Sequence, residues 1–91
     1  MSKAITHGLA QAAKDHLLSG RPITRLEAIV MYGVANLPDV AKELRREGWI
    51  VRTEEIFYAE ALVRLNKHAT VVPPSELPIR EIVVTQYRLS R

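Results

Sequence analysis

The chain has 91 residues, of which 47% are hydrophobic and 25% charged, and it carries a formal net charge of +3. It is long enough for one ordered domain, and its lack of cysteine excludes disulfide scaffolds, thiolate metal sites and cysteine nucleophiles. No apolar run approaches the ~20 residues that span a bilayer, and the first 14 residues lack the apolar core of a signal peptide, so we expect a cytoplasmic protein without membrane contact.

The positive charge is spread along the chain. Residues 1–48 carry seven basic and five acidic side chains, and residues 49–91 carry six and five. Neither half is a basic tail. The charge is therefore compatible with nucleic-acid binding but does not require it.

The first segment predicts a helix over residues 6–18. Its apolar residues recur every fourth position and therefore share one face: Ile5, Leu9, Ala13 and Leu17. Gly20 is a left-handed stop signal, and Pro22 prevents the helix from continuing.

Two more helices follow, each with its own start signal. Thr24 and Glu27 have the spacing of a capping box, and the helix that they begin ends at Gly33. Asn36 is the expected N-cap of the third helix, which ends at Gly48. The buried face of that helix is predicted from the i, i+3, i+4, i+7 spacing of Leu37, Val40, Ala41 and Leu44.

The spacing of the apolar residues changes after Gly48, from a helical to a strand-like pattern. Residues 49–53 and 81–89 are rich in β-branched and aromatic residues, which predicts two strands. Residues 54–67 fit both alternation and helical spacing. We favour an extended strand there, with a helix beginning near Thr53 as the alternative.

Three short helices followed by two strands predict an α+β fold of the winged-helix type. The whole chain, 1–91, would be a single domain with a helix-turn-helix over about 24–48 and a β-hairpin wing over about 49–89. The two helices of such a unit are joined by a tight turn, and the second lies in the DNA major groove.

The sequence also resembles a family of small helix-turn-helix proteins that are common in bacteriophages and prophages. The resemblance is carried by the stretches Leu17–Ala28, Tyr32-Gly33, Leu44–Ile50 and Tyr87-Arg88-Leu89. It implies a winged-helix domain and a DNA-binding regulator of transcription or of excisionase-like recombination. The chain departs from the family in two ways: Asn36 stands where a basic residue is usual, and the wing segment between Thr53 and Tyr87 is longer.

Candidate DNA contacts come from three regions. The third helix offers base and phosphate contacts, the start of the second offers a phosphate site beside the helix N-terminus, and the wing offers cations around its proline-rich break. The candidates are Arg21, Thr24, Arg25, Asn36, Lys42, Arg45, Arg46, Arg64, Lys67 and Arg80. Residues 37–48 carry three basic and three acidic side chains, so a solvated helix face is the competing interpretation.

We expect most of the aromatic residues to have structural roles. Trp49 is expected to anchor the first strand on the third helix, and Tyr87 is expected in the core. Phe57 and Tyr58 could form an oligomer contact or belong to the core. His7, His16 and His68 lack the spacing of a metal site, so we expect no bound metal.

The sequence has no phosphate-binding glycine loop, nucleophile elbow or paired catalytic carboxylates, so we expect neither an enzyme nor a cofactor or small-molecule substrate. The expected partner is double-stranded DNA, bound by a homodimer or by several copies, because one small module gives limited affinity. The alternative is a module that binds and modulates a host protein.

Overall fold

The computed structural model describes residues 3–90, with side chains from Leu9 to Ser90, and combines helices with one small sheet. The order is α1 (Lys3–Leu18), β1 (Ile23–Thr24), α2 (Arg25–Tyr32), α3 (Leu37–Arg46), β2 (Ile50–Phe57), α4 (Tyr58–Leu65) and β3 (Val83–Ser90). The predicted α+β class is confirmed. The expectations for the side chains of Ile5 and His7 lie outside the described side chains.

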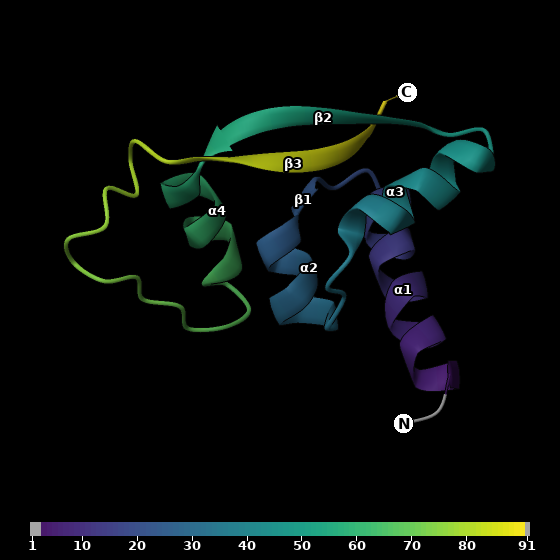
Figure 1. Ribbon diagram of the computed structural model, residues 1–91, viewed down its shortest axis with the longest axis horizontal. Helices are drawn as coiled ribbons and strands as arrows, with labels where there is room; N and C mark the ends of the chain where they lie inside the picture. The colour runs from purple at the N-terminus through teal and green to yellow at the C-terminus, as the bar shows by residue number, and fades with distance from the viewer. Residues whose placement is uncertain (1–2, 91) are drawn as a thin grey trace.

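The three strands form one antiparallel sheet in the order β1-β3-β2. β2 and β3 pair along their full lengths, from Ile50 opposite Ser90 to Phe57 opposite Val83. The two residues of β1 pair with β3 near its middle. The β2–β3 ribbon runs along one margin of the molecule, with α4 near one end and α3 and α1 near the other (Figure 1).

The three predicted helices are present, and two of their signals act as expected. Thr24 and Glu27 form the capping box at the start of α2, and Gly33 ends that helix in the left-handed conformation, at φ +68°. Asn36 is the N-cap of α3, but its side chain makes no capping hydrogen bond.

The main core joins the first three helices to the sheet. Its fully buried members come from each of these helices and from β1, and they include Ala13, Leu17, Ile23, Ala28, Leu37 and Leu44. Tyr87 is buried in this cluster, which confirms its structural role. Trp49 is 45% exposed, so the expectation of a core anchor is wrong. The residue lies at the α3–β2 turn, where its backbone N–H donates to the Leu44 carbonyl.

The segment 54–67 is not one extended strand. β2 continues to Phe57, and the chain then enters α4, so the favoured strand assignment is wrong for residues 58–65. The helical alternative fits that part because Ala61, Leu62 and Leu65 are buried on one face. Pairing with β3 extends β2, and backbone bonds from Tyr58 and Ala59 to residues 82 and 79 then bind the first turn of α4 to the returning chain.

One carboxylate connects elements that are far apart in the sequence. Glu27 is 4% exposed, and its Oε1 accepts hydrogen bonds from the Thr24 backbone N–H at 2.9 Å and from the Thr24 hydroxyl at 3.0 Å. Arg64 of α4 donates to the same oxygen at 2.6 Å. Arg64 also donates to the Gln86 side chain on β3 at 2.8 Å. α4 is thereby fastened to both α2 and the sheet.

A second buried polar group lies between α1 and α2. His16 Nε2 lies 3.0 Å from the Pro22 carbonyl, and Nδ1 lies 2.8 Å from the Tyr32 hydroxyl. The carbonyl can only accept, so the neutral ring carries its proton on Nε2 and accepts from Tyr32. Burial lowers the pKa of His16 below its ordinary 6.5. The Pro22 bond and Glu27 oppose this shift, whereas Arg21 and Arg64 add to it.

No helix within residues 3–90 is both long and apolar enough to cross a bilayer.

Arg64→Met should lower the free energy of unfolding by about 2–3 kcal/mol, because it leaves the buried Glu27 carboxylate without its cation. Lys67→Met is the matched control. Lys67 is exposed and forms no salt bridge with a described residue, so its loss should change stability by less than about 0.5 kcal/mol. Urea unfolding of both variants measures the difference, and equal effects would contradict the role of Arg64.

His16 should make stability depend on pH. The unfolded chain binds the proton more readily than the folded one, so this contribution is complete above pH 6.5 and is lost as the pH falls through the lowered pKa. Wild type should therefore lose more stability between about pH 7.5 and about pH 5.5 than His16→Gln does. Urea midpoints at the two pH values test this, and parallel losses would refute it.

Candidate nucleic-acid interface

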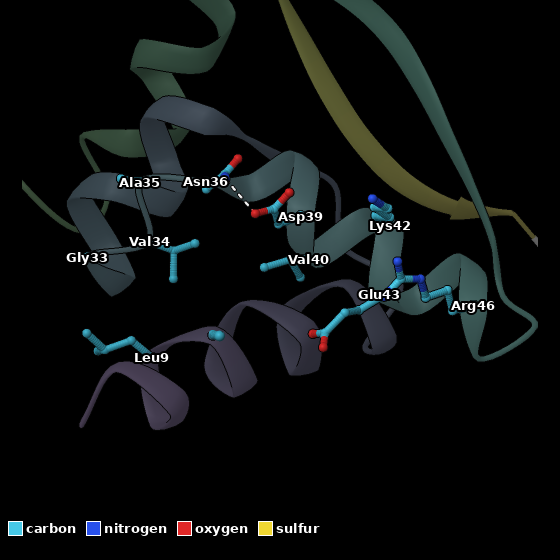
Figure 2. A pocket seen from close by; sticks show the side chains of 11 residues that line it. Leu9, Gly33, Val34, Ala35, Asn36, Asp39, Val40, Lys42, Glu43 and Arg46 are labelled. Carbon is cyan, nitrogen blue, oxygen red and sulfur yellow. Dashed lines mark hydrogen bonds between the residues drawn. The ribbon is translucent and has the colours of Figure 1, made fainter. Parts of the chain in front are cut away.

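The outer side of α3 borders an open groove of about 620 Å³ between α1, the α2–α3 turn and α3 itself (Figure 2). Apolar residues from all three parts line it, among them Leu9, Ala10, Val34 and Val40. The polar residues of the groove come from α3 and its N-cap: Asn36, Asp39, Lys42, Glu43 and Arg46.

The local sequence explains why these polar residues point outward. Leu37, Val40, Ala41 and Leu44 are all buried against the core, so the residues between them occupy the opposite side of the helix. Gly33 turns the chain sharply before α3. Its left-handed backbone is one that side chains rarely adopt, and an added Cβ would lie 3.5 Å from Leu9 Cδ1.

The carboxylates of α3 all have partners. Asn36 Nδ2 donates to Asp39 Oδ2 at 2.6 Å. Lys14 of α1 lies 3.3 Å from Glu43 and 2.8 Å from Glu47. The hydrogen bond that Lys14 donates to Glu47 is the main reason why the pKa of Lys14 is raised, although burial opposes it. In Figure 2 the Glu43 side chain extends from α3 toward α1.

The cations of α3 differ in their surroundings. Lys42 and Arg46 are exposed and form no salt bridge within the described part of the chain. Arg45 does not line the groove; its Nη2 donates to the Val51 carbonyl on β2 at 2.8 Å. Of the candidates expected on this helix, Asn36, Lys42 and Arg46 are brought together, whereas Arg45 is directed toward the sheet.

Near the start of α2, two of the candidates are exposed and the third is buried. Arg21 and Arg25 are exposed, and Arg21 Nε donates to the Ser19 hydroxyl at 2.9 Å. Thr24 is 1% exposed, and its hydroxyl takes part in the capping box. Thr24 is therefore not available for a surface contact.

The wing candidates lie in a separate part of the molecule. Arg64 is engaged by Glu27 and Gln86, so it is not the free phosphate contact that we expected. Lys67 and Arg80 are exposed, near the end of α4 and in the chain that returns to β3. Because α4 and α3 lie toward opposite ends of the ribbon, these two cations do not extend the α3 surface (Figure 1).

The sequence did not indicate Lys14. It lies on α1, and its two acidic partners are 29 and 33 positions further along the chain. No local pattern signals such a contact. Across the described residues, no group of three or more histidine, aspartate or glutamate side chains is placed to hold a metal ion.

No protein-family model matches the chain, and no curated protein or solved structure shows significant similarity to it.

Proposed function

We propose that this protein binds double-stranded DNA with α3 in the major groove and acts as a small regulator of transcription or recombination. The arrangement of elements supports this proposal. A helix, a short strand, two helices joined by a four-residue turn, and a two-stranded ribbon follow one another as in winged-helix domains, with α4 and a return segment inserted between the two strands of the ribbon. The phage-type resemblance of the sequence points the same way.

The observation that carries the proposal is the charge state of the exposed side of α3. Taken alone, residues 37–48 are neutral, which is unfavourable beside phosphates. Lys14 offsets Glu43 and Glu47 from the neighbouring helix, and Lys42 and Arg46 are left to face solvent. Residues 37–48 and Lys14 together carry four basic and three acidic side chains, an excess of one that includes Arg45 on the side toward the sheet. The proposal therefore rests on Lys42 and Arg46, which form no salt bridge with a described carboxylate.

Some of these residues would contact bases and others phosphates, according to the chemistry of each side chain. Arg46 can donate two parallel hydrogen bonds to guanine, and Asn36 can pair with adenine once its bond to Asp39 is exchanged. Lys42 supplies a compact charge for a phosphate. Arg21 and Arg25 are the phosphate contacts proposed for the start of α2, where Glu27 already engages the capping groups.

A module that binds a host protein is the second candidate. It is favoured by a shallow hollow at the other end of the ribbon, lined by Phe57, Ala59, Glu60, Val63 and Arg80. Phe57 and Val63 are 55% and 66% exposed. A pull-down from nuclease-treated host lysate separates the two functions: a protein retained after nuclease treatment supports the second, and its loss with the nucleic acid supports the first.

Lys42→Ala and Arg46→Ala should each weaken binding to DNA of the genome that encodes the protein. Each substitution should also reduce the slope of log affinity against log salt concentration by about 1, since one fewer counterion is released. Fluorescence anisotropy at several salt concentrations measures both quantities.

Lys67→Ala is the control for this experiment. It removes the same charge from an exposed position at the α4 end of the molecule, and it should leave affinity and slope nearly unchanged. Binding that does not depend on salt, or that falls equally in all three variants, would contradict a contact through α3.

A further inference from the structure

We propose that two copies of this chain associate edge to edge through β2, in antiparallel register, to form a continuous six-stranded sheet. The strand order would be β1-β3-β2 in one copy, followed by β2-β3-β1 in the second. This interface is independent of DNA and of the surface of α3.

The two edges of the sheet differ greatly. β1 has only two residues, so it offers almost no edge for pairing. β2 has eight, pairs with β3 in uninterrupted register and contains neither proline nor bulge. Figure 1 shows no other described element beyond β2 on that side of the ribbon. Such an edge is a template for another strand.

Symmetry restricts how β2 can pair with itself. A two-fold axis perpendicular to the sheet puts the same face of both sheets on the same side. Even-numbered residues of β2 therefore lie opposite even-numbered residues of the second copy, and odd-numbered residues lie opposite odd-numbered ones. With Thr53 on the axis, Arg52 lies opposite Glu54 of the second copy, and this pair occurs twice. Ile50 then lies opposite Ile56, and Trp49 lies opposite Phe57. Opposite-charge, apolar and aromatic cross-strand pairs, and threonine pairs, are favourable contacts in sheets.

The two neighbouring registers of the same symmetry are unfavourable. Moving the axis to Arg52 places the two arginines directly opposite each other, and moving it to Glu54 does the same for two glutamates. Like charges in that position destabilise a strand pair. The charge pattern of β2 therefore selects the register centred on Thr53.

The surroundings of β2 within one copy agree with this arrangement. Arg52 lies directly opposite Arg88, whose Nε is 3.1 Å from Glu54, so Arg52 has a like-charge neighbour across the ribbon and no salt bridge to a described residue. Trp49, Ile50 and Phe57 are 45%, 63% and 55% exposed. The proposed pairing gives Arg52 a carboxylate and covers these three apolar side chains.

Two contacts of the pairing are less favourable. Val51 lies opposite Glu55, and Arg45 already donates to the Val51 carbonyl at 2.8 Å. A carbonyl oxygen has two lone pairs, so Arg45 leaves one for the second copy. The four favourable kinds of pair outnumber the single unfavourable kind, Val51 opposite Glu55.

The first test is Arg52→Glu, measured by sedimentation equilibrium. Wild type should be dimeric, and the substitution should weaken the dimer by about tenfold or more because it faces Glu54 with a like charge twice. Within one copy it places a carboxylate opposite Arg88, so circular dichroism should show that the variant keeps the secondary structure of wild type. A monomeric wild type, or a dimer unaffected by Arg52→Glu, would overturn the proposal.

The second test is a disulfide cross-link, which reports the register directly. The chain has no cysteine, so Thr53→Cys introduces a single thiol that would lie opposite its own copy. Oxidation should link this variant efficiently. Glu55→Cys is the matched control, because its two thiols would be about 13 Å apart at the rise of a β-strand. Equal cross-linking of both variants, or preferential linking at position 55, would overturn the register.

Discussion

The structure depends on the buried carboxylate of Glu27. That group closes the capping box of α2 and at the same time accepts a hydrogen bond from Arg64 of α4. A buried carboxylate without a cation would be costly, so the position of α2 and the position of α4 are linked by one oxygen atom. Gln86 connects the same arginine to the central strand, and its amide also donates to Glu54 on β2.

This linkage explains the shape of the ribbon's closed end. A chain that leaves β2 and returns as β3 could form a simple hairpin with basic residues at its tip. Here it forms α4 and a long return segment instead, and Arg64 is used to hold α4 against the body of the protein. The cations that remain exposed in this region, Lys67 and Arg80, follow α4 along the chain, and α4 lies near the other end of the ribbon from α3 (Figure 1). The proposed DNA contact therefore rests on α3 and the start of α2.

The features that the sequence predicted correctly are those with local causes. The Thr24–Glu27 spacing, the stop at Gly33 and the apolar stripe of α3 each act within one or two helical turns. The error over residues 58–65 concerns a long-range contact. The apolar residues of segment 54–67 fit both the alternation of a strand and the spacing of a helix. Only the pairing of β2 with β3 decides where β2 ends and α4 begins. Trp49 follows a helix that buries one face, but the turn at Gly48, with φ +97°, leaves the tryptophan half exposed.

The candidate site shows the same division. The outward direction of Asn36, Lys42 and Arg46 follows from the helical period. The engagement of Arg64 by Glu27, 37 positions earlier, and that of Glu43 by Lys14 do not follow from any local pattern. These two contacts change the charge balance most: one removes a cation from the expected DNA surface, and the other offsets the acidic groups of α3.

The central claim is that α3 presents the DNA-binding surface, and nuclear magnetic resonance of the isotope-labelled protein tests it most directly. When a duplex fragment from the encoding genome is added, the backbone amide signals of residues 36–46 should shift most, with smaller shifts near Arg21 and Arg25, and the signals of residues 66–80 should stay in place. Shifts concentrated in residues 66–80, or no shifts at all, would contradict the account.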